Sequence, residues 1–280
     1  MKIIKKVSLM QKYSLKWRDK KKIGFVPTMG YLHEGHLSLL KRACGENDIV
    51  ILSIFVNPIQ FGPKEDYGKY PRDFKRDEKI AEKAGVDVIF YPSRPDMYPE
   101  GYKSYVEVKD LQDYLCGKSR PGHFRGVATV VLKLFNIIQP YNAYFGQKDA
   151  QQAIIIKQMV KDLNIPLNIK ILKTFREKDG LAMSSRNSYL SEKERRAALI
   201  LSKTLLEIKK DILSGERDAA LLSRKAGRLI KKEPLSKPDY FSFVNERTLV
   251  PVQKLSGNIL AAAALWIGKT RLVDNFRLKV

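Results

Sequence analysis

The feature that most constrains the fold is the run Ile-Val-Ile-Leu-Ser-Ile-Phe-Val at 49–56, in which apolar side chains are almost continuous. A strand with one solvated face alternates polar and apolar residues, whereas a strand covered on both faces does not. The run therefore predicts a strand inside a parallel sheet that has helices on both faces.

Further predicted strands alternate with predicted helices from the N-terminus to about residue 172. Each strand is a short apolar run, and each helix shows apolar residues at helical spacing. The predicted strands are 2–5, 23–26, 86–92, 104–108 (an edge strand), 143–146 and 168–172, and the predicted helices include 36–46, 71–84 and 127–138. This order predicts an α/β fold with a doubly wound parallel (Rossmann-like) sheet and right-handed crossovers.

The remainder of the chain has a different order of elements. A polar loop at 174–186 leads to two predicted helices and then to three predicted strands without helices between them. The helices are expected at 191–213 and 217–232, and the strands at 240–244, 258–267 and 270–276. We therefore expect a Rossmann-like domain over 1–174 and a second, smaller α+β C-terminal domain over 175–280.

Composition limits the kinds of partner. The 280 residues include 52 Lys and Arg against 30 Asp and Glu, but the basic residues are spread along the chain and form no Arg-rich tract. This charge favours anionic ligands without naming one, and no nucleic-acid-binding motif accompanies it. The chain shows no apolar run of membrane-spanning length and no signal-peptide order. Cys44 and Cys116 form no disulfide framework, so we expect a cytoplasmic protein with no membrane or nucleic-acid partner.

The stretch 23–36, Ile-Gly-Phe-Val-Pro-Thr-Met-Gly-Tyr-Leu-His-Glu-Gly-His, is the first candidate site. It predicts a strand, a loop and a helix start, where free N–H groups and the helix dipole attract anions such as phosphate. His33 and His36 lie three residues apart on one helical face and can both donate hydrogen bonds to phosphate oxygens. A pair of surface histidines is the alternative, and a metal site is less favoured because no ligand cluster accompanies them. The segment resembles the nucleotide-binding signature of the nucleotidyltransferase superfamily.

Two more segments follow predicted strands, at the sheet edge where α/β proteins bind ligands. Asn57 and Gln60 are polar residues among apolar ones, which suits a small polar substrate, although a simple Asn-Pro turn is the alternative. Lys148 follows the strand at 143–146 and could serve as a phosphate cation. His123 and Arg125 could reach a substrate, but a structural loop explains their spacing equally well.

Five ordered motifs together resemble one family. They are Pro-Thr-Met-Gly-x-Leu-His-x-Gly-His at 27–36, Phe-Val-Asn-Pro-x-Gln-Phe at 55–61, Arg-Pro-Gly-His-Phe-Arg-Gly-Val at 120–127, Gly-x-Lys-Asp-x-Gln-Gln at 146–152 and Asp-Gly-Leu-Ala-Met-Ser-Ser-Arg-Asn at 179–187. The set closely resembles the pantothenate synthetase (pantoate–β-alanine ligase) family. The resemblance implies that ATP, with Mg²⁺, activates pantoate as an enzyme-bound pantoyl adenylate. β-Alanine then displaces AMP, and pyrophosphate is the other product.

The resemblance also implies which residues bind the nucleotide. They are Met29, Gly30, Tyr31, Leu32, His33, Glu34, Gly35, His36, Gly146, Gln147, Lys148, Asp149, Phe175, Met183, Ser184, Ser185 and Arg186. Phe175 departs from the family, in which many members carry valine where a backbone group contacts the base.

Pantoate-binding glutamines of the family match Gln60 and Gln152, and Gln60 also falls where β-alanine is held. Asn57, Pro27 and Thr28 complete the expected substrate-binding set. The family's catalytic histidine matches His36, and we expect transition-state charge to be stabilised by a set of donors and cations. This set is His33, His36, Lys148, Ser184, Ser185 and Arg186.

Magnesium commonly relies on substrate phosphates, water and one or two carboxylates, so we expect no protein cage and consider only Asp77 as an outer ligand. The resemblance implies a homodimer. Another nucleotidyltransferase is the nearest alternative function, and Gln60 and Gln152 argue against it. A basic nucleic-acid-binding protein with a decayed enzyme site is the alternative from another class.

Overall fold

The computed structural model describes residues 1–63 and 65–280, and these residues form two compact units. Unit 1 comprises Met1–Gln112, Arg120–Gly146 and Gln152–Lys173. Unit 2 comprises Asp113–Ser119, Gln147–Gln151 and Thr174–Val280. Each unit is described separately below.

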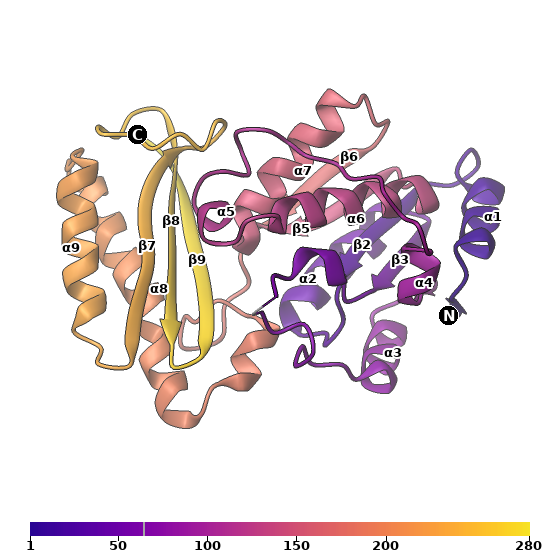
Figure 1. Cartoon of the computed structure of the whole chain (residues 1–280), viewed down its shortest axis with the longest axis horizontal. Coiled ribbons are helices and arrows are strands. Elements are labelled where there is room, and N and C mark those ends of the chain that lie inside the picture. The colour runs from indigo at the N-terminus through magenta and orange to yellow at the C-terminus, as the bar shows by residue number, and fades with distance from the viewer. Residues whose placement is uncertain (64) are drawn as a thin grey trace. The chain divides into compact units, whose positions relative to one another are not determined.

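Unit 1 is built on a six-stranded sheet with the order β1-β4-β3-β2-β5-β6, in which all neighbouring strands are parallel. Figure 1 labels four of its strands, β3, β2, β5 and β6. The strands are β1 (Lys2–Ile4), β2 (Ile23–Thr28), β3 (Ile49–Ile54), β4 (Val88–Phe90), β5 (Asn142–Gly146) and β6 (Asn168–Leu172). The predicted run at 49–56 is therefore an interior strand, because β3 lies between β4 and β2.

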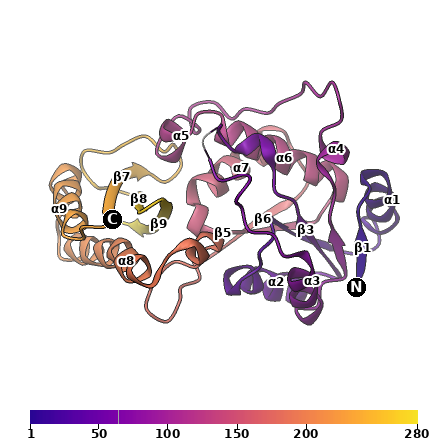
Figure 2. The same ribbon diagram turned by 60° about the horizontal axis from the view of Figure 1, so that its bottom comes forward.

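Helices cover both faces of this sheet (Figure 2). On one face pack α1 (Val7–Trp17), α6 (His123–Ile138) and α7 (Ala150–Asp162), and on the other pack α2 (Glu34–Glu46) and α3 (Phe74–Lys83). Shorter helices of unit 1 are α4 (Arg94–Met97) and the 3₁₀ turn η1 (Pro58–Gln60), whereas α5 (Cys116–Ser119) and the 3₁₀ turn η2 (Gln147–Asp149) belong to unit 2. The predicted doubly wound parallel sheet is confirmed.

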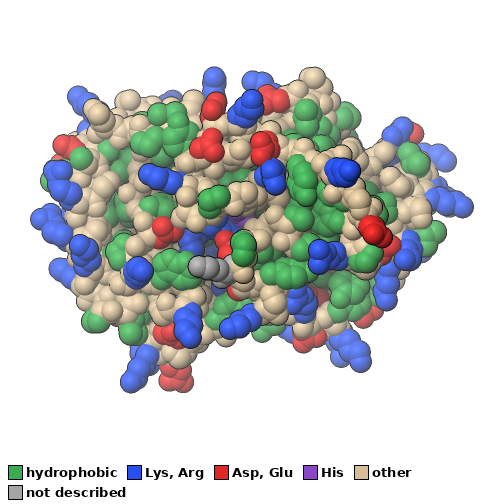
Figure 3. Space-filling model, viewed as in Figure 1, with side chains coloured by type: hydrophobic (Ala, Val, Ile, Leu, Met, Phe, Trp, Pro, Cys, Tyr) green, Lys and Arg blue, Asp and Glu red, His purple; other side chains and the backbone are tan. Residues whose placement is uncertain are grey.

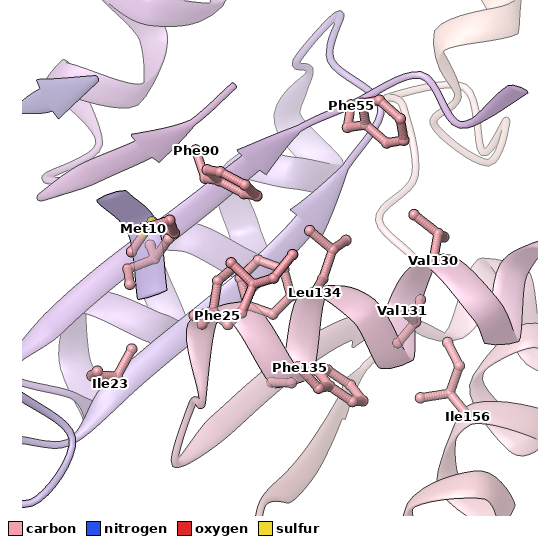
Figure 4. Packing of buried hydrophobic residues seen from close by; sticks show 14 of the residues in the cluster. Met10, Ile23, Phe25, Phe55, Phe90, Val130, Val131, Leu134, Phe135 and Ile156 are labelled. Atoms are coloured by element: carbon pink, nitrogen blue, oxygen red, sulfur yellow. The ribbon is translucent and has the colours of Figure 1, made fainter. Parts of the chain in front are cut away.

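The strands are covered on both faces of the sheet, which explains why their sequences are almost continuously apolar. Phe25 lies in the cluster that includes α1 and α6, whereas its neighbour Val26 lies in the cluster that includes α2 and α3. Figure 4 shows Phe25 beside Leu134 and Phe135, two side chains that α6 directs toward the sheet. Each large apolar side chain removed from water in this way contributes about 1.5–3 kcal/mol.

Unit 2 contains a three-stranded antiparallel sheet with the order β7-β8-β9. Its strands are β7 (Ser236–Asn245), β8 (Asn258–Ile267) and β9 (Thr270–Lys279), and its helices are α8 (Glu192–Leu213) and α9 (Ala219–Lys231), with the 3₁₀ turn η3 (Ser185–Tyr189) before them. Alternate residues of β8, from Ile259 to Ile267, pack in one cluster with the apolar faces of both helices. The β8–β9 turn favours glycine at Gly268, whose φ is +55°.

One predicted strand was wrong. Residues 104–108, all of them described, lie outside the strands, because the backbone N–H of Val106 donates to Thr129 Oγ1 (2.9 Å) on α6 instead of to a neighbouring strand. Val106 and Val108 do pack on the core, so the alternation in this segment reflects burial without strand pairing.

Helices α3 and α6 begin three and four residues away from their predicted starts. Helix α3 starts at Phe74, because the side chain of Asp73 caps it by accepting from Arg76 N (3.0 Å). Helix α6 starts at His123 instead of 127 and thereby takes in residues 123–126 of the motif at 120–127, which the sequence places in a loop.

Three properties are relevant to the partners considered above: the surface charge, the helix lengths and the state of the cysteines. Figure 3 shows Lys and Arg side chains dispersed over one face of the molecule, with acidic side chains among them. Among the described helices, none combines the length and the apolar character needed to cross a bilayer. Cys44 and Cys116 are both free cysteines.

Candidate active site

The loop after β2 is shaped by a hydroxyl and by two left-handed residues. Thr28 Oγ1 donates to Ser53 O of β3 (2.7 Å) and accepts from Gly30 N (3.2 Å). Gly30 has φ +88° and Tyr31 has φ +53°, so the chain turns sharply before α2. Pro27 and Thr28, predicted as substrate contacts, are the last two residues of β2.

Asp77 of α3 holds this loop in place. Its two carboxylate oxygens accept from Tyr31 N (2.6 Å) and Leu32 N (2.7 Å), and the side chain is 1% exposed. Arg76 adds a bond from Nη2 to Leu32 O (2.8 Å). Burial raises the pKa of Asp77 above its ordinary value, although both backbone N–H groups and Arg76 oppose that shift.

These bonds do not suit the predicted role of Asp77 as an outer magnesium ligand. Both of its oxygens face backbone donors, and the carboxylate is buried. Across residues 1–63 and 65–280, no group of three or more His, Cys, Asp or Glu side chains could hold a metal. Both oxygens of Asp77 therefore hold the loop at Tyr31 and Leu32.

His33 and His36 stack at the start of α2, with ring centroids 4.0 Å apart and an interplanar angle of 26°. His33 is the N-cap residue, and its backbone N–H donates to His36 Nδ1 (3.3 Å). Because a backbone N–H can only donate, Nδ1 of His36 accepts, and the proton of the neutral ring lies on Nε2. His36 therefore carries an Nε2–H donor in the first turn of α2, which also contains the predicted residues Glu34 and Gly35.

Gln60 ends η1 and is 9% exposed. Its Nε2 lies 3.1 Å from Met29 Sδ, which brings together the loop at 29–36 and the segment after β3. Asn57 Nδ2 donates to Gln60 Oε1 (3.0 Å), and Asn57 itself is 1% exposed. Asn57, predicted to bind substrate, is thus placed to hold the side chain of Gln60.

The motif at 120–127 supports the backbone of Gln60. His123 Nδ1 lies 2.8 Å from Gln60 O, which can only accept, so Nδ1 carries the proton and Nε2 accepts from Arg120 Nη1 (3.0 Å). Arg120 also donates from Nε and Nη2 to both oxygens of Glu65 (2.7 and 2.5 Å). Burial raises the pKa of Glu65, but the bonds and charge of Arg120 outweigh it and hold the pKa below its ordinary value.

Arg125 of the same motif points to another group of residues. Its guanidinium lies 4.6 Å from the ring centroid of Tyr105, and its Nη1 lies 3.6 Å from Glu107 Oε1. Of the two motif residues that the sequence left open, His123 therefore contacts a predicted site residue, and Arg125 stabilises the segment at 104–108.

In unit 2, η2 forms what we call the lysine turn, residues 147–149, which follows Gly146 at the end of β5. Asn275 of β9 holds this turn, since its Nδ2 donates to the carbonyl oxygens of Gln147 (3.0 Å) and Lys148 (2.9 Å). Lys148 Nζ lies 3.6 Å from Asp149 Oδ1. Asn275, which the sequence did not single out, thus holds the backbone of the turn that carries Lys148.

The segment at 175–186 is also anchored to β9 within unit 2. Arg176 makes a bidentate pair with the buried Asp274 (2.6 and 3.0 Å), and Met183 N donates to Phe175 O (3.0 Å). Ser184 is the N-cap of η3 and accepts from Arg186 N (3.3 Å).

Comparison with known proteins decides the family. A family model described as Pantoate-beta-alanine ligase matches residues 2–277. The chain belongs to this family. The pantothenate synthetase of Caldicellulosiruptor saccharolyticus is 58% identical over 263 residues, 94% of each chain.

Solved structures agree with the family assignment. The pantothenate synthetase of Thermus thermophilus has a TM-score of 0.95 at 41% identity and covers 100% of both chains. A pantoate-beta-alanine ligase of Francisella tularensis, solved with beta-gamma ATP and beta-alanine, has a TM-score of 0.80 at 40% identity and covers 99% of this chain and 97% of that one. The predicted family, fold class and ligase activity are confirmed.

Adjacent glutamines of this pantoate-beta-alanine ligase have different surroundings. Gln151 is 6% exposed, accepts from Cys116 N (3.0 Å) and donates to Tyr114 O (2.7 Å), all within unit 2. Gln152, the predicted pantoate contact, is half-buried in the first turn of α7. The pair Gln-Gln gives no indication in the sequence of which member is structural.

Sequence reasoning missed three contacts that hold predicted site residues or their backbone. Asp77 accepts from the backbone of the loop, Tyr98 donates to Asn57 Oδ1 (2.7 Å), and Asn275 donates to the lysine turn. Each of these contacts joins residues that are far apart in the sequence. The role of Asp77 could have been inferred from its place on the apolar face of a predicted helix, because a carboxylate that is buried there requires a hydrogen-bond partner.

Proposed function

We propose that this ligase forms pantothenate in two steps on the residues described above, with ATP and pantoate reacting first and β-alanine second. The observation that carries the proposal is the position of His36 in the first turn of α2. Its Nδ1 accepts from the backbone of His33, which makes Nε2–H the group that the ring can donate to an anion. The complex of the Francisella tularensis ligase with beta-gamma ATP and beta-alanine supports the choice of ATP and β-alanine as substrates.

In the first step a carboxylate oxygen of pantoate attacks the α-phosphorus of ATP, and pyrophosphate leaves. Negative charge develops on the phosphate oxygens, and fixed donors lower the barrier by stabilising it. In unit 1 we assign this work to His33, His36 and the N–H groups of the first turn of α2. In unit 2 we assign it to Lys148, Ser184, Ser185 and Arg186.

We propose that magnesium enters as part of the substrate MgATP. It neutralises phosphate charge, and its coordination by phosphate oxygens and water requires at most one or two carboxylates from the protein. The half-exposed Asp149 of the lysine turn is the carboxylate we assign to this contact, in place of the buried Asp77.

Gln60 and Gln152 are proposed to orient pantoate for in-line attack, an effect of position more than of charge. In the second step the neutral amine of β-alanine attacks the acyl carbon of pantoyl adenylate. A C–N bond forms, the C–O bond to AMP breaks, and the proton lost from nitrogen passes to water. The products of this step are pantothenate and AMP.

We further propose a cytoplasmic homodimer. The two free cysteines suit a reducing compartment, and the dimer follows from the family resemblance. Analytical ultracentrifugation of the purified chain tests the dimer, and a species of one chain's mass would contradict it.

The decisive assay is pyrophosphate release from MgATP with pantoate, with and without β-alanine. We expect a burst of about one equivalent per site without β-alanine and steady turnover with it. His36→Ala should abolish the burst, whereas Lys41→Ala, an exposed residue on the same helix, should leave it unchanged. Absence of pantoate-dependent release from the unmodified enzyme would reject the first step, and a full burst from His36→Ala would reject the role of His36.

A further inference from the structure

We propose that Tyr98 is a positioning residue that, together with the Gly126 carbonyl, holds the Asn57 amide and thereby fixes which end of the Gln60 amide faces the substrate. The inference rests on the proposed substrate contact of Gln60. It concerns a relay of three side chains in unit 1, in which the hydroxyl of Tyr98 acts through Asn57 on Gln60. Its consequence is a fixed N–H donor, which selects an oxygen acceptor on the substrate.

The relay takes its direction from a backbone carbonyl. An amide side chain can present either oxygen or nitrogen, but Gly126 O can only accept, so the Asn57 atom that lies 3.1 Å from it is Nδ2. The contact is possible because α6 approaches η1 closely at Gly126. A Cβ at this position would overlap Ile59 O.

The opposite end of the Asn57 amide agrees with this orientation. Its Oδ1 lies 2.7 Å from the hydroxyl oxygen of Tyr98, which donates to it. Burial raises the pKa of Tyr98 well above its ordinary value, so the hydroxyl keeps its proton across the working range of pH. Tyr98 therefore holds Asn57 Oδ1 on one side while Gly126 holds Nδ2 on the other.

The second hydrogen of Asn57 Nδ2 then determines the orientation of Gln60. This hydrogen points to Gln60 Oε1 (3.0 Å), which leaves Gln60 Nε2 as the end of the amide that faces Met29 Sδ (3.1 Å). A thioether is a weak acceptor. A carboxylate or hydroxyl oxygen can replace it at little cost, whereas an ammonium group would meet a donor.

The ring of Tyr98 is held independently of its hydroxyl. Its centroid lies 6.1 Å from that of Phe55 and 5.0 Å from that of Tyr102. The ammonium of Lys133 lies 5.7 Å from the Tyr98 ring centroid and 4.6 Å from that of Tyr102. Tyr98→Phe should therefore keep the packing and remove only the donor.

The test measures kcat and KM for pantoate, β-alanine and ATP separately with purified full-length variants. In Tyr98→Phe we expect the KM of one acid substrate to rise about tenfold, the loss corresponding to one buried hydrogen bond, with the KM of ATP unchanged. A rise for pantoate assigns the donor to the hydroxy acid, and a rise for β-alanine assigns it to the carboxylate of the amino acid.

Two further variants separate the relay from simple packing. Asn57→Asp keeps the acceptor for Tyr98 but places an oxygen against Gln60, so the amide should turn and present Oε1 to the substrate. We expect Asn57→Asp to raise the affected KM more than Asn57→Ala, which only releases Gln60. In the Asn57→Ala background, Tyr98→Phe should have no further effect, because the relay is already broken.

The outcomes distinguish this inference from the proposed function. If Gln60→Ala keeps the KM of both acids, the substrate contact of Gln60 is rejected. If Gln60→Ala is impaired while Tyr98→Phe keeps every KM within about twofold, less than one hydrogen bond would give, only the relay is rejected. An equal effect of Tyr98→Phe with and without Asn57 would likewise overturn the relay and assign Tyr98 to packing alone.

Discussion

Replacing Asp77 by Asn should impair catalysis far more than it impairs folding. The carboxylate accepts two backbone hydrogen bonds, from Tyr31 N and Leu32 N, at 2.6 and 2.7 Å. Hydrogen bonds to a charged group contribute about 1.5–3 kcal/mol each. An Asn side chain can supply only one oxygen, and its amide nitrogen would then face a second N–H donor.

Much of the stability lost in Asp77→Asn is regained, because the variant no longer buries a charge. The raised pKa of Asp77 shows that burial disfavours its ionised form. We therefore expect the free energy of unfolding in urea to fall by only about 1–2 kcal/mol, the difference between one lost bond and the relieved desolvation.

The effect on activity is larger because the loop leads directly into His33 and His36. A displacement of about 1 Å at reacting groups commonly costs about 100-fold in rate. We expect kcat/KM for ATP in Asp77→Asn to fall between about 10-fold and 100-fold, measured as pyrophosphate release with saturating pantoate.

Asp73→Ala is the matched control for Asp77→Asn. It removes the N-cap of the same helix, at a cost of about 0.5–2 kcal/mol in stability, without touching the loop. Equal stability losses with an activity loss only in Asp77→Asn would support the reasoning. Wild-type kcat/KM in Asp77→Asn would refute it.

The pH dependence of stability provides a second readout for Asp77. Because its pKa is raised on folding, the folded state binds the proton more tightly than the unfolded state does. The contribution of this group is therefore greatest below its unfolded pKa of about 3.9 and is lost as pH rises through the folded pKa. Asp77→Asn should lack this decline.

Three other contacts give shorter predictions. Gly126→Ala should lower the free energy of unfolding by about 1–3 kcal/mol, because the new Cβ would overlap Ile59 O; an unchanged urea midpoint would contradict the close approach. Arg120 lowers the pKa of Glu65, so that stabilisation is present above the ordinary carboxylate pKa of about 4.3 and is lost as pH falls through the lower folded value. Glu65→Gln should make stability less dependent on pH in this acid range, and an unaltered profile would count against the ion pair. Asn275→Ala should raise the KM of ATP about tenfold while leaving that of pantoate unchanged, and equal effects on both would refute a specific role on the lysine turn.

Most of the fold could be predicted from the sequence, because a strand that is buried on both faces has an almost continuous apolar sequence. The continuous apolar run at 49–56 required helices on both faces, and the structure places Phe25 and Val26 in opposite clusters for the same reason. The strand predicted at 104–108 was wrong, because alternating apolar residues indicate which side chains are buried and not whether the backbone pairs with another strand. Val106 satisfies its N–H with a threonine side chain, which no periodicity can indicate.

The site was predictable where chemistry is local and not where support comes from far along the chain. His33 and His36 are three residues apart, so their proximity follows from helix geometry. Asp77 lies 46 residues from the backbone N–H of Tyr31 that it holds, and Asn275 lies 127 residues from Lys148. Contacts of this kind depend on how the elements pack, which the residue pattern alone does not specify.

The division of the chain has a consequence for protein engineering. The polypeptide passes between the two units at five places, after residues 112, 119, 146, 151 and 173. The lysine turn therefore belongs to unit 2, although in the sequence it lies between two segments of unit 1. A chimera that exchanged only the C-terminal segment between two family members would join a foreign β9 to a resident lysine turn. Exchange of the whole of unit 2 therefore requires three separate pieces of sequence, 113–119, 147–151 and 174–280.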